Sequence, residues 1–416
     1  MLEKIKSIII KILIKTQKYT GTDNIYLAKY SSYLIIGNVV SLAASFLLSI
    51  AFARLLPKEV YGDYRYILSI FEILAVSSLQ GLNGVIIQGV ARGFDGAIKE
   101  GLKTKLKWSL LGSFASLIVG IYFWITGNVN FTICFLIIAA FLPLMKGSEL
   151  YQSVLDGKKL FGKRTKYSII IQVFYTLSLL VALFLTKNLV LIVFIYFFSL
   201  TLVRTYFMLR GFKRFIANNN TDPQIITYGK HTSLIGIIGL VSQQIDKILL
   251  FHFIGPIQLA IYSFATLPVD NLRSPLQTIQ ELALPKLSTR PTEEIKKTLP
   301  RKLLKACVFI LLFIGIYIII VPYVFKIFFP QYLDSVFYSK LYSFDLLVFP
   351  MSMMMLAIYA KMKTKELYKV NIINPIIQIA LAVILVPLYG ITGAIIARLT
   401  SHIFYFFLSY YFFKKI

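Results

Sequence analysis

The sequence predicts an all-α integral membrane protein with twelve transmembrane helices in two six-helix lobes around a central cavity. Hydrophobic residues make up 57% of the 416 residues and charged residues only 15%, which is too apolar a balance for a soluble chain. Apolar runs of about twenty residues, each able to cross roughly 30 Å of hydrocarbon as a helix, recur between Tyr33 and Phe413. The runs are continuous, whereas the strands of a transmembrane barrel would alternate polar and apolar residues.

The expected spans divide into two halves of six. In the first half they are 33–53, 66–88, 108–126, 131–155, 167–186 and 189–209; in the second half they are 233–254, 257–285, 304–328, 338–360, 370–387 and 391–413. Around them we expect a basic amphipathic segment on the membrane surface, an N-terminal lobe, a cytoplasmic linker and a C-terminal lobe, at residues 1–30, 31–215, 216–232 and 233–416.

The net charge of +26 follows a positive-inside pattern. Most of the 44 Lys and Arg residues fall in loops expected on one side, such as 99–107, 158–166 and 286–305, while links on the other side, such as 127–130 and 388–390, are short. This asymmetry predicts that both termini are cytoplasmic. It also accounts for the excess charge without a nucleic-acid partner.

The two halves carry a weak internal repeat. A shift of 198 residues places residues 55–66, LLPKEVYGDYRY, on residues 253–264, FIGPIQLAIYSF, and aligns Glu72 with Asp270. Both windows fall on the outside turn between the first and second helices of a half. Because each half has an even number of helices, the halves share an orientation and are related by a pseudo-two-fold axis along the membrane normal.

Charged residues at membrane depth mark the candidate site. The predicted hairpin over residues 237–277 carries Asp246, Lys247, Asp270 and Arg273. A charge at that depth costs several kcal/mol unless it faces a protein interior or a watery cavity. We therefore expect this hairpin to line a polar chamber.

Further polar residues at membrane depth allow two interpretations. Lys146 and Glu149 are three residues apart on one helix face, so they either form a buried ion pair or line the cavity. Arg65 either reaches toward the headgroups or faces the cavity from the mouth of the second helix. Gln243 and Gln244 could bind sugar hydroxyls or another helix.

Catalytic and metal-binding patterns are not found. His231, His252 and His402 are isolated, Arg204 and Arg398 are assigned no role, and the two cysteines are unpaired in sequence. The GxxxxGK-like segment at 157–164 has Arg where a phosphate loop has Ser or Thr. These patterns favour a transporter over an enzyme, with no metal and no cofactor.

Four segments resemble the polysaccharide flippases of the multidrug/oligosaccharidyl-lipid/polysaccharide exporter superfamily, in particular the O-antigen and capsule repeat-unit flippases. They are ARLLPKEVYGDYRY, IDKILLFHFIGPIQLAIYSFA, FFPQYLDS and YGITGAIIARL, and the resemblance extends from Tyr30 over the rest of the chain. The chain departs from that family at Pro57, where Gly is usual, and at Ile257 and Gln258, where acidic residues are common.

The resemblance implies a carrier in the bacterial inner membrane that moves an undecaprenyl-diphosphate-linked oligosaccharide from the inner to the outer leaflet by alternating access. It further implies contact with membrane lipid, possible H+ or Na+ coupling, and a pathway shared with polymerase and chain-length proteins. In a cationic cavity of that kind the substrate-binding candidates are Arg273, Lys247, Lys146, Arg65, Gln243 and Gln244. The counter-charge or cation-coupling candidates are Asp270, Asp246, Glu149 and Glu72.

Three alternatives stay open at this point. A drug or organic-cation antiporter of the same superfamily needs an exposed acid and little cationic lining, and the first span, 33–53, has no acid. A flippase for the peptidoglycan precursor fits the same charge pattern. A membrane-embedded polysaccharide polymerase usually carries a large outside loop with catalytic residues, which this chain lacks.

Overall fold

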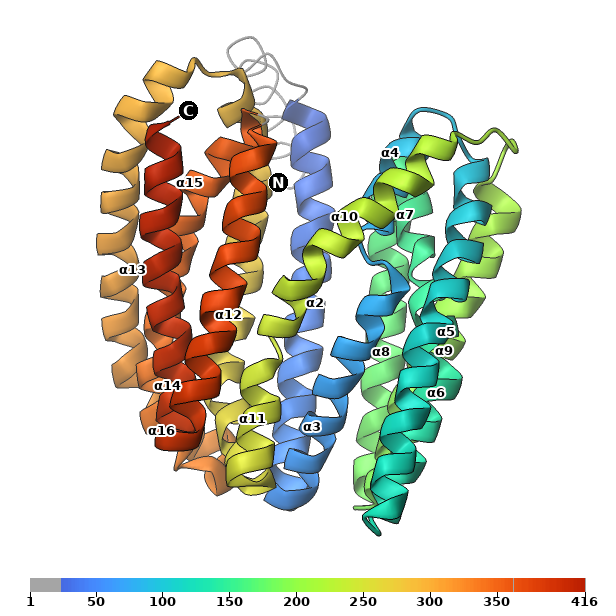
Figure 1. Ribbon diagram of the computed structural model, residues 1–416, viewed down its shortest axis with the longest axis vertical. Coiled ribbons are helices and arrows are strands. Elements are labelled where there is room, and N and C mark those ends of the chain that lie inside the picture. Colours follow the sequence, from blue (N-terminus) through green and yellow to red (C-terminus); the bar gives the residue numbers. More distant parts are fainter. Residues whose placement is uncertain (1–23, 362, 416) are drawn as a thin grey trace, which may run out of the picture.

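The computed structural model describes residues 24–361 and 363–415, and this part of the chain is helical, with no strand (Figure 1). Two bundles of helices stand side by side. Helix α2 begins and α16 ends at the same end of the molecule, which we call the terminal end; the opposite end is the distal end. The predicted surface segment lies outside the described residues as far as residue 23, and from Asn24 the chain already belongs to α2.

The N-terminal lobe contains six passes. They are α2 (Asn24–Leu55); α3 (Lys58–Leu74) with η1 (Ala75–Ser78) and α4 (Leu82–Ala91); α5 (Gly96–Ile125); α6 (Val129–Ser148) with α7 (Leu150–Gly157); α8 (Phe161–Leu185); and α9 (Leu189–Phe215). The second pass bends by 46° between η1 and α4, where Leu79 has a positive φ of 56°. Asn128 and Asn188 cap α6 and α9 by accepting hydrogen bonds from backbone N–H groups of the first turn.

The C-terminal lobe contains the other six passes. They are α10 (Pro223–Ser242) with α11 (Ile245–Ile254); α12 (Pro256–Thr289); α13 (Thr292–Phe328); η2 (Pro330–Tyr332), α14 (Ser335–Tyr342), η3 (Ser343–Leu347) and α15 (Val348–Ala360); and α16 (Thr364–Lys414). Helix α16 holds two passes because the chain turns back at Gly390, whose φ of 56° and ψ of −129° suit glycine. A Cβ on Gly393 would overlap the carbonyl of Leu385 across that turn.

The twelve predicted passes agree with this arrangement. Within the described residues nine helices are long and apolar enough to span a membrane, and the bent pair at α3 and α4 adds a tenth. The remaining two are the second half of α16 and α12, which is 34 residues long but more polar. The two-lobed, all-helical fold predicted from the sequence is confirmed.

The predicted linker over residues 216–232 is shorter than expected. Helix α10 begins at Pro223, capped by the Asp222 side chain, which accepts from the Gln224 backbone N–H at 3.0 Å. It then crosses diagonally from one lobe to the other (Figure 1). A Cβ on Gly229 would overlap Leu82, so α10 packs closely on α4 of the N-terminal lobe.

A buried carboxylate fastens the remaining linker, residues 216–222, to the N-terminal lobe. Asp95, at the start of α5, is fully buried and accepts from the Ala217 N–H and from Lys158 Nζ, both at 2.8 Å. The Gly96 N–H donates to the Asn220 carbonyl at 2.9 Å. Residues 216–222, which connect the two lobes, are therefore fixed to the N-terminal lobe by these hydrogen bonds.

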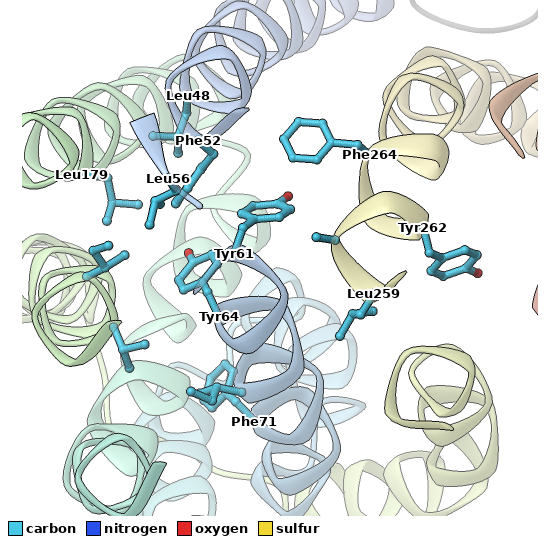
Figure 2. Packing of buried hydrophobic residues seen from close by; sticks show 14 of the residues in the cluster. Leu48, Phe52, Leu56, Tyr61, Tyr64, Phe71, Leu179, Leu259, Tyr262 and Phe264 are labelled. Carbon is cyan, nitrogen blue, oxygen red and sulfur yellow. The ribbon is translucent and has the colours of Figure 1, made fainter. Parts of the chain in front are cut away.

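The lobes meet at the distal end through the two segments of the internal repeat. The Tyr61 ring lies 4.8 Å from the Phe264 ring, and Phe264 lies 3.9 Å from Tyr332 (centroid distances). Figure 2 shows Tyr61 and Phe264 facing each other between α3 and α12. A Cβ on Gly62 would overlap the carbonyl of Pro256, so the two helices touch backbone to backbone. The distal end is closed in this state.

Candidate functional site

The charged residues predicted in the first half gather inside the N-terminal lobe. Lys146 Nζ on α6 lies 3.5 Å from Glu72 Oε2 on α3 and 3.7 Å from Glu149 Oε1 at the end of α6. Arg204 on α9, which was assigned no role from the sequence, places its Nη1 3.2 Å from Glu149 Oε1. Two cations thus face two acids from three helices, and Lys146 has its charge neutralised within the lobe.

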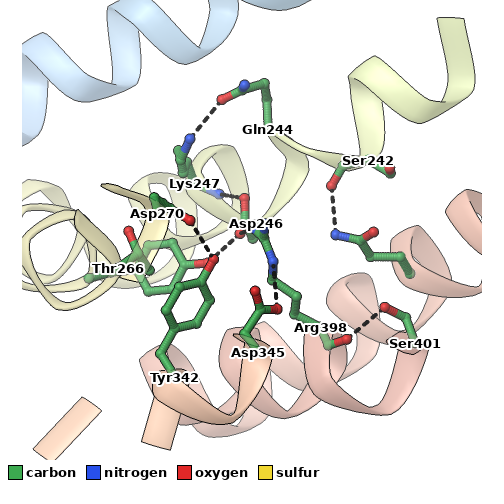
Figure 3. A network of polar contacts seen from close by, with 12 residues as sticks. Ser242, Gln244, Asp246, Lys247, Thr266, Asp270, Tyr342, Asp345, Arg398 and Ser401 are labelled. Carbon is green, nitrogen blue, oxygen red and sulfur yellow. Dashed lines mark hydrogen bonds and ion pairs between the residues drawn. The ribbon is translucent and has the colours of Figure 1, made fainter. Parts of the chain in front are cut away.

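A second cluster, in the C-terminal lobe, centres on an acid that was not predicted. Asp345 on η3 has a side chain that is 0% exposed. It forms an ion pair with Arg273 on α12, and its Oδ1 lies 2.8 Å from His402 Nε2 on α16. The same Oδ1 lies 3.4 Å from Nε of Arg398, also on α16 (Figure 3). Burying a carboxylate requires such compensation, because the interior does not solvate its charge.

Arg398 and His402 therefore correct the sequence-based interpretation, which gave them no role. Both lie on one face of α16, four residues apart, and turn toward Asp345. The signal for Asp345 was available, since it is an acid inside the apolar run 338–360. Its partners could not be read in the same way, because they come from helices far away in the sequence.

Asp246 and Asp270 extend this cluster through two buried tyrosines. The Tyr262 hydroxyl donates to Asp246, and the Tyr342 hydroxyl donates to Asp270 Oδ1 at 3.1 Å (Figure 3). Each acid also lies near one of the two arginines of the cluster, at 3.7 Å for Asp246 and 3.5 Å for Asp270. Three acids therefore surround two arginines, and neither arginine carries an unbalanced charge.

Lys247 and Arg65 differ from these cations, since within the described residues neither has an acid in ion-pair distance. Lys247 Nζ donates to Gln244 Oε1 at 2.9 Å, and Arg65 Nε is buried without a hydrogen bond in the described part of the chain. Arg65, Asp246 and Asp270 all lie within electrostatic range of Lys247, the two acids beyond ion-pair distance. The helices of Lys247 and Arg65, α11 and α3, belong to different lobes and are in contact, with the Tyr66 and Phe251 rings stacked at 3.8 Å.

A cavity of about 800 Å³ lies beside the Asp345 cluster. Residues of α10, α12, α15 and α16 line it, together with η1 and the residues after it from the N-terminal lobe. Arg273, Arg398, His402 and Gln243 are among the lining residues. The lining reaches Tyr368, near the start of α16 at the terminal end of the molecule, whereas the lobes are in contact at the distal end.

The structure therefore divides the ten predicted site residues into three groups. Arg273 and Gln243 line the cavity, with Asp246 and Asp270 in the cluster behind it. Lys247, Gln244 and Arg65 lie where α11 meets α3. Lys146, Glu149 and Glu72 form the separate cluster of the N-terminal lobe. Across the described residues, no group of three or more His, Cys, Asp or Glu side chains is arranged to hold a metal ion.

The sequence matches, over residues 27–288, the family model described as polysaccharide biosynthesis protein. No curated protein matches the sequence. Several solved structures share the fold. The inward-facing conformation of a multidrug resistance MATE family transporter of the MOP superfamily is 14% identical, covers 91% of this chain and 98% of its own, and has a TM-score of 0.66.

The lipid II flippase MurJ, in an inward closed conformation, is 13% identical, covers 93% of this chain and 87% of its own, and has a TM-score of 0.67. The outward-facing conformation of a MATE family transporter, also 13% identical, covers 93% of this chain and 95% of its own but has a TM-score of 0.57. At these identities the likeness concerns the fold alone.

Proposed function

This chain belongs to the polysaccharide biosynthesis protein family, and from that premise we propose that it is a flippase for polyprenyl-diphosphate-linked oligosaccharide repeat units. It would carry them from the inner to the outer leaflet of the bacterial inner membrane by alternating access, for O-antigen or capsule synthesis. The positive-inside pattern supports a cytoplasmic location for the terminal end, with both termini. The state described here then faces inward.

The observation that carries the proposal is the pair of cations, Arg65 and Lys247, at the contact between the lobes. The other four basic side chains of the two clusters lie within 4 Å of acids, so little positive charge remains on them for a ligand. Arg65 and Lys247 have no acid within 4 Å among the described residues, so their positive charge is less compensated than that of the other four, and a doubly charged diphosphate would balance it. Lys as a point charge and Arg as a planar fork are both suited to phosphate oxygens.

The position of this pair also suits a carrier. Arg65 is on α3 of one lobe and Lys247 is on α11 of the other, so any rocking of the lobes changes the distance between them. An anion that binds both residues would favour one arrangement of the lobes over another. Binding at this contact can therefore be coupled to alternating access.

The break between α10 and α11 connects this pair with the cavity. Gln244, the first residue of the break on the α11 side, accepts from Lys247, while Gln243 beside it lines the cavity. A diphosphate held by Lys247 would therefore have its sugars next to the cavity. The volume of about 800 Å³ is in the upper part of the usual range for ligand sites, roughly 300–1,000 Å³.

Opening toward the distal side requires only a few polar contacts to break. Lys58 Nζ lies 3.3 Å from Asp334 Oδ2, and Arg54 Nη2 donates to the Ile327 carbonyl at 2.7 Å, both between the lobes. Exposed pairs of this kind contribute about 0–1 kcal/mol each. Moving one negative charge outward gains roughly 2.3 kcal/mol per 100 mV, so a diphosphate could move without a coupled ion. If a proton is exchanged, Asp270 and Glu149 are our candidates.

A drug or organic-cation antiporter is the second candidate function, and it is the one that the MATE likeness would suggest. Such a carrier needs an acid that is free to meet a cation. Each of the four predicted acids, Asp246, Asp270, Glu149 and Glu72, already has a Lys or Arg within 4 Å. A cationic drug would have to displace that partner first, which favours an anionic substrate.

The test is the pool of lipid-linked oligosaccharide in the native host with this gene deleted and then restored. We expect undecaprenyl-linked repeat units to accumulate on deletion and to return to normal with the wild-type gene. Restoration with Arg65→Gln plus Lys247→Gln should fail, while Lys187→Gln, an exposed loop control, should succeed. An unchanged pool together with increased sensitivity to cationic drugs would mean that the antiporter is correct. Accumulation of the peptidoglycan precursor alone would indicate that the protein is a flippase for that precursor.

A further inference from the structure

Six side-chain amides of the described residues line the cavity. Three of them recur at spacings of three and four residues on α16, so they lie along one face of that helix. The others come from the turn after η1, the break after α10, and α12, so that they surround the cavity from both lobes. The six are Gln80, Gln243, Gln280, Asn371, Asn374 and Gln378.

Most of these amides are available to a ligand. Gln378 Nε2 donates to the Ser242 carbonyl at 3.1 Å, and Gln280 donates to Ser352, so two amides are held by the protein. The other four make no side-chain hydrogen bond within the described residues, and the Oδ1 of Asn374 is buried without a partner there. A buried polar group in that condition favours any ligand that can pair with it.

The charged residues of the lining also favour an uncharged ligand. Arg273 and Arg398 reach the cavity but are engaged by Asp345, Asp270 and Asp246 from behind. No Asp or Glu is among the described residues that line the cavity. A carboxylate entering it would lose water without gaining a free cation, which makes its burial unfavourable.

We propose that this cavity is the sugar subsite of the carrier and that it selects uncharged, hydroxyl-rich or N-acetylated sugars over uronic or other acidic sugars. The proposal rests on the flippase function proposed above and adds the substrate class. A carboxamide both donates and accepts, as do hydroxyl and acetamido groups, so the four amides that the protein does not hold can pair with an oligosaccharide in many ways. A carboxylate only accepts hydrogen bonds, so it can pair with the N–H donors of the amides but not with their carbonyl oxygens. Recognition of the diphosphate stays with Arg65 and Lys247.

The experiment measures equilibrium binding to the purified full chain in detergent. The probes are two short-chain prenyl diphosphate trisaccharides, one built of hexose and N-acetylhexosamine and one with a uronic acid in place of the hexose. We expect the neutral probe to bind about tenfold more tightly or better, the scale of one or two lost hydrogen bonds. Equal affinities, or tighter binding of the acidic probe, would overturn the proposal.

Three variants locate the effect. Asn374→Leu should weaken the neutral probe by about tenfold, and Gln88→Leu, the same kind of change at an exposed glutamine of α4 outside the cavity, should not. Asn374→Lys should instead tighten the acidic probe by about fivefold or more, because it supplies the missing cation. A gain of affinity cannot come from misfolding. If Asn374→Lys leaves the ratio of the two affinities unchanged, the cavity does not hold the sugars.

Flipping of the two full-length lipid-linked forms in proteoliposomes separates this proposal from the function on which it rests. If neither form is flipped but the binding ratio is as expected, the flippase assignment fails while the sugar subsite stands. If both are flipped at equal rates and bind equally, the flippase assignment stands and the selectivity is wrong. The two proposals can therefore fail independently.

Discussion

Asp345→Asn tests whether the C-terminal cluster is held together by a buried acid. Asp345 is 0% exposed, and its Oδ1 lies 3.4 Å from Arg398 Nε. At an effective dielectric constant of about 20, a pair at that distance attracts by roughly 5 kcal/mol, part of which is offset by desolvation. Removing one partner of a buried pair typically costs about 3–5 kcal/mol. Because Asp246 and Asp270 remain beside the arginines, we expect a loss of about 3 kcal/mol.

The assay is SDS titration of the purified protein in mixed micelles, followed by far-UV circular dichroism. Arg273→Met is expected to cost a similar amount, since it leaves Asp345 with one cation fewer. The double variant should cost less than the sum, with a coupling of about 2 kcal/mol. Asp334→Asn, the same substitution in an exposed pair, should stay within about 1 kcal/mol of wild type. Additive single effects, or an Asp345→Asn protein as stable as the Asp334→Asn control, would refute the reasoning.

Two glycines provide further predictions. Gly62→Ala places a Cβ against the carbonyl of Pro256 and should push the lobes apart at the distal end. In a chain without native cysteines, a Tyr332→Cys reporter should then react faster with an impermeant maleimide than it does with Gly62 present. An unchanged reaction rate would contradict the closed distal contact. Gly390→Ala puts a side chain on a backbone with φ of 56° and ψ of −129°, so unfolding should become easier by about 1–3 kcal/mol, and a neutral effect would mean that the turn between the two halves of α16 adapts freely.

The candidate site was only partly legible in the sequence. The hairpin of α11 and α12 could be predicted as a polar segment, because charged residues inside an apolar run are visible locally. Arg273 was predicted as a cation for the substrate, and the structure instead places it in an ion pair with Asp345. Lys247, predicted alongside it, turns out to have no acidic partner among the described residues, so it differs from Arg273 in a way that no spacing could show.

The cavity shows the same division. Gln243 was a candidate because it stands one turn from Asp246, yet the amides of α16 were not considered at all. Asn371, Asn374 and Gln378 share a helix face in the sequence, but that pattern does not say what the face covers. It becomes a lining only when α10 and α12 pack around it.

What the sequence by itself determined is the helical membrane class, the twelve passes, their grouping in two related halves and the expected sidedness. These follow from hydrophobic length and charge distribution, which are properties of neighbouring residues and need no knowledge of the fold. What only the tertiary structure decided is which charges cancel. Asp345 pairs with Arg273, 72 residues earlier in the chain, and with His402, 57 residues later. Lys247 has no acid within ion-pair distance among the described residues. Neutralisation depends on distances of a few ångströms between separate helices, and packing alone sets those distances.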